Sequence, residues 1–166
     1  MPMLTRRQWI GSGALAAVAL SVAGMVADSQ ETDHDVLAAV IPVMLDGAIP
    51  SAPALRRSAV SQILAGFDVA VSGLTPSVQA EVAQLFALLR IAPLRIFATG
   101  IVGPWASQPP QRIARFLTDW RYSDVEKLRS AYDALHQLIL ASWYGQPQSW
   151  AATGYPGPPS GVHPNP

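Results

Sequence analysis

The stretch SDVEKLRSAYDALHQLI, residues 123–139, decides the fold of this chain. Its apolar residues advance in steps of three and four, the spacing that places side chains on one face of an α-helix. They are Val125, Leu128, Tyr132, Leu135 and Ile139. Ahead of them, Ser123 and Glu126 have the spacing of a capping box, in which each side chain accepts a hydrogen bond from the other's backbone N–H. The stretch therefore predicts a long amphipathic helix capped by Ser123.

Shorter periodic segments lie on the N-terminal side of this helix. Apolar residues recur at helical spacing in segments 36–41, 55–67, 82–89 and 113–120. Thr32 or Asp33 is expected to cap the first helix, and Pro42 is expected to end or kink it. Thr75 followed by Pro76 predicts another helix start. Since no strand-like alternation of useful length occurs, we predict an all-α fold, a compact irregular bundle of about five or six helices.

The character of the sequence changes after Tyr144. Ten of the 22 residues from 145 to 166 are proline or glycine, and both residue types disfavour helix interiors. We therefore expect no helix there and predict an extended tail that lies on a surface. The chain divides into a signal segment at 1–27, a helical domain at 28–144 and this Pro/Gly-rich aromatic tail at 145–166.

The signal segment rests on the order Thr5-Arg6-Arg7-Gln8-Trp9-Ile10, which resembles a twin-arginine (Tat) export signal. An uncharged, weakly hydrophobic stretch follows at residues 10–27 and predicts a signal helix. Ser21 and Ala23 are small residues at suitable positions for cleavage. We expect a cleaved signal and a periplasmic protein; an alternative is that the stretch stays as an inner-membrane anchor.

Composition excludes several classes of function. The chain has 11 basic and 11 acidic residues, and residues 28–166 keep 9 basic and 11 acidic ones, a charge of −2. A nucleic-acid partner is therefore not expected. The lack of cysteine rules out disulfides, thiolate nucleophiles and iron–sulfur ligation. With 50% hydrophobic and 13% charged residues, the chain is apolar for a soluble monomer, which favours a subunit interface.

The chemistry-bearing residues predict neither a catalytic nor a metal site. His34, His136 and His163 occur in three separate contexts, without the i, i+4 spacing of a helical metal site. The glycines at 100 and 103 do not follow a predicted strand, so they lack the setting of a nucleotide-binding loop. We expect no catalytic residue and no cofactor in this chain.

The aromatic residues divide into two groups. Phe67, Phe86, Phe116 and Tyr132 have core spacing. A second group lies in or beside Pro/Gly-rich segments and is predicted to bind a partner, because interfaces are enriched in large amphipathic rings. Its members are Trp105, Trp143, Tyr144, Trp150 and Tyr155, and the neighbouring Pro156 is predicted to bind the partner with them. The alternative is that the tail packs on its own helices.

The whole pattern resembles the small subunits of bacterial FAD-dependent dehydrogenases, the gluconate 2-dehydrogenase subunit 3 type with its sorbitol and fructose dehydrogenase relatives. The resemblance rests on the leader at Thr5 to Ile10, the chain length, the helical middle and the ending Trp143-Tyr144-Gly145 … Trp150 … Gly154-Tyr155-Pro156. It implies a non-catalytic subunit that binds a large GMC-type flavoprotein and supplies the Tat signal for both. FAD would then lie in the partner, and a cytochrome c subunit can complete such assemblies.

Two rival functions stay open on the sequence. One is a free-standing exported helical protein that binds or converts a small molecule in a pocket among its helices. The other is a membrane-anchored scaffold that keeps residues 10–27 as its span.

Overall fold

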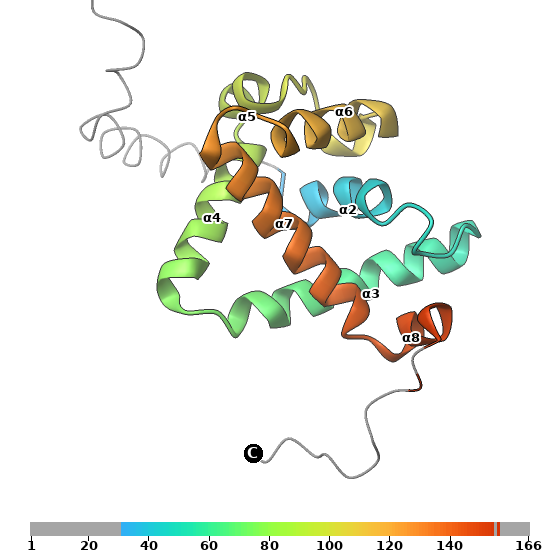
Figure 1. Ribbon diagram of the computed structural model, residues 1–166. Coiled ribbons are helices and arrows are strands. Elements are labelled where there is room, and N and C mark those ends of the chain that lie inside the picture. Colours follow the sequence, from blue (N-terminus) through green and yellow to red (C-terminus); the bar gives the residue numbers. More distant parts are fainter. Residues whose placement is uncertain (1–30, 155, 157–166) are drawn as a thin grey trace, which may run out of the picture.

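Helix α2 (Asp33–Met44) forms the centre of the core in the computed structural model, which describes residues 31–154 and 156. Val36, Leu37, Val40 and Ile41 are all fully buried. Around α2 pack α3 (Pro53–Ser72), α4 (Pro76–Arg90), α6 (Pro110–Arg121) and the short 3₁₀ helix η2 (Trp105–Ser107). Figure 1 shows this arrangement. The signal segment, with Arg6, Arg7 and Trp9, and the tail residue Tyr155 lie outside the described residues.

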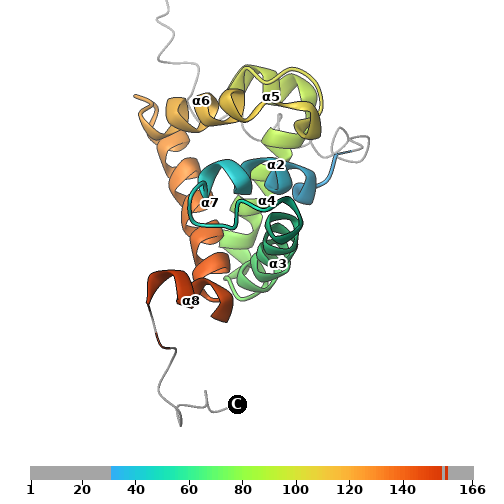
Figure 2. The ribbon, with the colours of Figure 1, turned by 90° about the vertical axis from the view of Figure 1, so that its right-hand side faces the viewer.

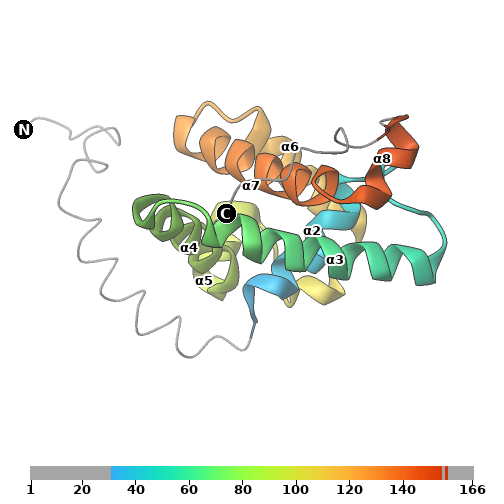
Figure 3. The same ribbon diagram turned by 90° about the horizontal axis from the view of Figure 1, so that it is seen from below.

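Three further helices complete the bundle. They are α5 (Ala92–Thr99), α7 (Glu126–Tyr144) and α8 (Pro147–Thr153). Helix α7 packs across α3 (Figures 1 and 3), and a Cβ on Gly66 of α3 would lie only 3.1 Å from the Ser142 carbonyl oxygen of α7. The described part of the chain is all-α with seven α-helices and no strand, which confirms the predicted fold class.

Proline is the first residue of four of the seven described α-helices, and the start at Pro76 was predicted. Pro53, Pro76, Pro110 and Pro147 are each the first residue of a helix. The first turn of a helix has unpaired N–H groups, so a residue without an N–H fits there at no cost. Core positions predicted from the helical spacing are confirmed for Phe67, Phe86, Phe116 and Tyr132. Leu55 and Val125, also predicted on apolar faces, are 60% and 53% exposed.

The predicted capping box at Ser123 and Glu126 is wrong. Helix α7 begins at Glu126, with Val125 in extended backbone as its N-cap and no side-chain cap. Ser123 Oγ instead accepts a hydrogen bond from the Val125 N–H at 3.1 Å. This local turn holds Val125 outside the helix, because serine competes for nearby backbone donors. The first position of the predicted apolar face is lost for the same reason.

Two expectations about helix ends are wrong: that Pro42 ends its helix, and that no helix occurs after residue 145. Helix α2 continues through Pro42 to Met44, because a proline this close to the C-terminal end removes one N–H and leaves little helix beyond it to disturb. In the predicted tail, residues 147–153 form α8. There Pro147 is the first helical residue and Gly154 follows the last one with φ of 70°, so both residues delimit the helix and neither interrupts it.

A capping box does occur at the start of α2. The Asp35 N–H donates to Thr32 Oγ1 at 3.2 Å, and the Thr32 N–H donates to Asp35 Oδ2 at 2.7 Å. The Thr32 N–H and the Thr32 hydroxyl both donate to Asp35 Oδ2, and these two bonds hold the pKa of the Asp35 carboxyl below its ordinary value of 3.8. A pKa that is lower in the folded than in the unfolded chain means that Asp35 stabilises the fold above pH 3.8, and that this contribution is lost as the pH falls through the folded-state pKa.

We expect Thr32→Ala to lower the free energy of unfolding by about 1 kcal/mol at pH 7, and by less as the pH falls below 3.8. Thr75→Ala is the matched control, because Thr75 is also an N-cap but makes no cap hydrogen bond. It should change stability by less than about 0.5 kcal/mol. Urea unfolding at a series of pH values measures both variants. Equal effects of the two variants at pH 7 would contradict the assignment.

Candidate docking surface

The aromatic residues predicted to bind a partner do not form one surface. Trp105 is fully buried and Trp143 is 4% exposed, so both belong to the core and their assignment to an interface is wrong. Tyr144 is 44% exposed, Trp150 is half-buried on α8, and Pro156 is exposed. The Trp150 indole donates to the Tyr144 carbonyl at 3.0 Å. This pair agrees with the alternative that the tail packs on its own helices.

Trp105 is held in the core by polar contacts as well as by packing. Its indole N–H donates to the Leu89 carbonyl oxygen of α4 at 2.9 Å, and its ring meets Phe116 edge-on at 5.6 Å between centroids. Its backbone N–H donates to Glu31 Oε1 at 2.7 Å. A buried tryptophan normally needs such a partner for its N–H. Trp105 therefore fixes η2 against α4, α6 and the start of the helical domain.

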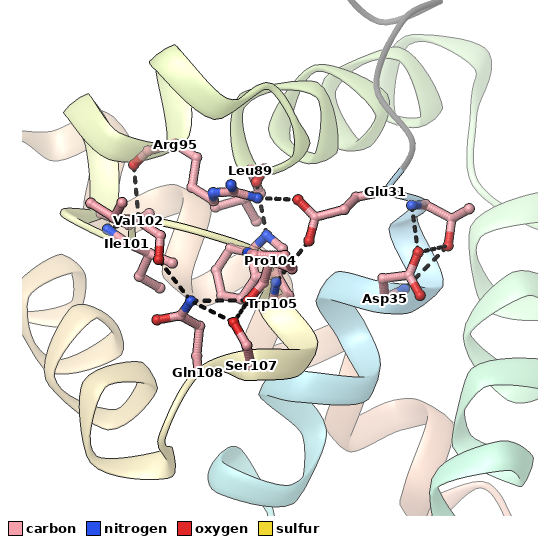
Figure 4. Close-up of polar contacts among 12 residues, drawn as sticks. Glu31, Asp35, Leu89, Arg95, Ile101, Val102, Pro104, Trp105, Ser107 and Gln108 are labelled. Carbon is pink, nitrogen blue, oxygen red and sulfur yellow. Dashed lines mark hydrogen bonds and ion pairs between the residues drawn. The ribbon is translucent and has the colours of Figure 1, made fainter.

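Glu31 has a second contact, with a buried cation. Its other carboxylate oxygen pairs with Arg95 Nη1 of α5, and the Arg95 residue is only 3% exposed. Figure 4 shows Glu31 between Arg95 and Trp105. A buried guanidinium is costly without a counter-charge. Glu31 therefore neutralises Arg95 and draws the inner side of α5 onto the core.

Other hydrogen bonds fix the C-terminal half of α5. The Trp120 indole of α6 donates to the Ala98 carbonyl at 2.9 Å. Thr99 Oγ1 donates to the Arg95 carbonyl at 2.8 Å and accepts from the Ile101 N–H at 3.1 Å. Helix α5 ends at Gly100, whose φ of 69° is in the left-handed region that favours glycine. The backbone of α5 is thus fixed from its inner side.

The outer side of α5 is apolar and exposed. Phe97 is 92% exposed, the highest fraction among the described large hydrophobic residues, and Ile96 and Val102 are 44% and 61% exposed. Gln108 Nε2 donates to the Val102 and Pro104 carbonyls, both at 2.9 Å, and so orders the loop that carries Val102. We call Ile96, Phe97 and Val102 the α5 patch. An ordered, exposed apolar patch is typical of a protein interaction site.

The α5 patch and the aromatic pair Tyr144 and Trp150 are far apart. Helices α5 and α8 lie at opposite ends of the bundle in both views (Figures 1 and 2). The sequence analysis did not predict the α5 patch, because Ile96 and Phe97 lie in a short segment without a longer helical repeat. The exposure of Ile96 and Phe97 follows from the burial of Arg95 on the opposite side of α5. That burial depends on Glu31, which is 64 residues away, so the local sequence does not predict it.

Two ion pairs lie at the start of α2. His34 Nε2 lies 3.0 Å from Asp68 Oδ1, and Asp33 Oδ1 lies 2.8 Å from Arg90 Nε. Burial raises the pKa of the Asp33 carboxyl, and the charge of Arg90 opposes that shift. No group of three or more His, Asp or Glu residues in 31–154 is placed to hold a metal ion.

Within the described part of the chain, no single helix has the length and apolar character to cross a membrane. Helices α4 and α5 reach that length and composition only together, and they are bent by 91° at their junction.

Comparisons with protein-family models, curated proteins and solved structures find no match to this chain.

Proposed function

We propose that this chain is a non-catalytic accessory small subunit of an exported FAD-dependent sugar or alcohol dehydrogenase. In this proposal a large GMC-type flavoprotein carries the FAD and the chemistry, and a cytochrome c subunit can join the complex. The Arg6-Arg7 leader takes both chains through the Tat translocase to the periplasm. The observation that carries the proposal is the α5 patch, an exposed apolar surface on a backbone fixed by Glu31, Arg95 and Trp120.

The α5 patch suits a stable partner better than a transient one. Three large apolar side chains in water cost free energy in the monomer, and covering them on binding recovers it at roughly 25 cal/mol per Å². Because the backbone beneath them is already ordered, little conformational entropy is lost when the partner binds. The position of Glu31 adds a second argument. It couples the residues that follow the leader to the helix that bears the patch.

Co-purification tests the proposal. The full chain, tagged at its C-terminus, is expressed in its native host and recovered from the periplasm together with any bound flavoprotein. We expect equal amounts of both subunits and one FAD per complex, measured by its visible absorption. Recovery of the tagged chain as a stable monomer free of flavoprotein would count against the proposal. N-terminal sequencing of the recovered chain separates a cleaved leader from the membrane-anchored alternative.

Export itself gives a separate prediction. Replacing Arg6 and Arg7 by lysine should reduce the amounts of both subunits outside the cytoplasm, because the proposal gives the two chains a single Tat signal. Quantitative immunoblots of periplasmic and cytoplasmic fractions measure the change. The matched control is the pair Arg56→Lys and Arg57→Lys, an adjacent arginine pair on α3, which should leave export unchanged. Undiminished export of the flavoprotein with the leader variant would contradict the shared signal.

A further inference from the structure

A pocket of about 350 Å³ opens where the C-terminal ends of α2 and α6 meet the first half of α7. Its apolar wall includes Val43 and Met44 of α2 and the buried Leu117 of α6. Its polar wall includes Arg121, Tyr132 and His136. This volume lies at the lower end of the range for small-molecule sites, which combine apolar walls with a few converging polar groups. The pocket is separate from the α5 patch and shares no residue with it.

Arg121 is the principal charge in this pocket. Its guanidinium carbon lies 5.4 Å from the ring centre of Tyr122 and 5.8 Å from that of Tyr132. The ion pairs among the described residues involve His34, Arg56, Arg90 and Arg95, and none involves Arg121. No aspartate or glutamate is among the lining residues. Arg121 is therefore an exposed cation that lies against the buried Tyr132 ring and the exposed Tyr122 ring, and its N–H donors have no carboxylate acceptor in the described part of the chain.

A flat aromatic surface stands beside this cation. The rings of Tyr132 and His136 are stacked, with centroids 5.6 Å apart and planes inclined by 12°. Tyr132 is 9% exposed and His136 is half-buried, so packing holds both rings in place. The Thr118 hydroxyl is not available as a donor to a ligand, because it already donates to the Ala114 carbonyl at 2.8 Å. The pocket thus combines one exposed guanidinium, one stacked aromatic pair and an apolar wall.

We propose that this pocket binds a small aromatic carboxylate. The carboxylate would accept hydrogen bonds from the Arg121 guanidinium, whose planar fork fits two carboxylate oxygens at once. The aromatic body would pack against the stacked Tyr132 and His136 rings and the apolar wall. The pocket volume limits the ligand to about one ring with short substituents. This assignment gives the chain a ligand site of its own, independent of docking to a flavoprotein.

Titration with benzoate tests the assignment. Binding to the purified full chain is followed by NMR shifts of the Tyr132 and His136 ring protons and by calorimetry. We expect saturable binding that Arg121→Gln weakens about tenfold or more, because a charge-assisted hydrogen bond is lost. Arg115→Gln is the matched control. Arg115 is exposed on the same helix outside the pocket, and its replacement should leave the affinity unchanged.

Two further measurements show whether binding depends on the negative charge of the ligand or only on its shape. Benzamide has the same ring without the negative charge and should bind about tenfold more weakly than benzoate. Equal affinity for benzamide, or equal affinity of Arg121→Gln and the wild type for benzoate, would overturn the proposal. Failure of benzoate to bind, together with loss of flavoprotein co-purification in Arg121→Gln, would also overturn it and would assign Arg121 to a carboxylate of the partner subunit.

Discussion

Trp105→Ala is expected to destabilise the chain by about 3–5 kcal/mol, the range for removing a large aromatic side chain from a core. Three losses add up at this position. The indole is fully buried, so its removal leaves a cavity between η2, α4 and α6. The Leu89 carbonyl loses its hydrogen-bond donor, and the edge-on contact with Phe116 disappears. Typical domains have only about 5–15 kcal/mol of stability in total.

Urea unfolding of the purified chain, followed by circular dichroism, measures this effect. Phe97→Ala is the matched control, since it also truncates an aromatic residue but at a position that is 92% exposed. It should change stability by less than about 0.5 kcal/mol. If Trp105→Ala costs less than about 1 kcal/mol, the indole does not hold η2 to the core. The same outcome would reopen Trp105 as an interface residue.

The helices could be predicted from the sequence because their signals are local. The proline starts at 53, 76 and 110, and the spacing of apolar residues after them, depend only on the nearest turns of the chain. Helix α8 was missed because prolines and glycines were counted over residues 145–166 without regard to their position. Pro147 and Gly154 lie at the two ends of the helix, where each is favourable.

The candidate site was harder to predict because it depends on contacts that are distant in sequence. The proline- and glycine-rich segment around Trp105 predicts a surface position, but Trp105 is buried. Its backbone N–H donates a hydrogen bond to the carboxylate of Glu31, which is 74 residues away. The same glutamate buries Arg95 and so turns Phe97 outward. A pattern that places apolar residues inside and charged residues outside predicts the opposite orientation of α5. The Glu31–Arg95 pair and the Trp120–Ala98 hydrogen bond hold α5 in the observed orientation, and the local sequence of α5 predicts neither contact.

Under the proposed function, Phe97→Asp is expected to weaken binding to the flavoprotein about 30-fold or more. A central aromatic residue of an interface typically contributes at least about 2 kcal/mol, and a buried carboxylate without a partner adds a desolvation cost. The fold should not change, because Phe97 projects into solvent from a helix fixed on its other side by Arg95 and Trp120. The affinity of the purified variant for the isolated flavoprotein, measured by biolayer interferometry, checks this expectation, with circular dichroism as the test of folding.

Tyr144→Asp is the control that locates the docking surface. Tyr144 is 44% exposed and is the last residue of α7, next to α8, and α8 lies at the opposite end of the bundle from α5 (Figure 2). If the α5 patch is the docking surface, Tyr144→Asp binds like the wild type while Phe97→Asp does not. The reverse pattern would move the interface to α8 and the tail. Because the two positions lie at opposite ends of the bundle, the pair of variants shows which end carries the interface.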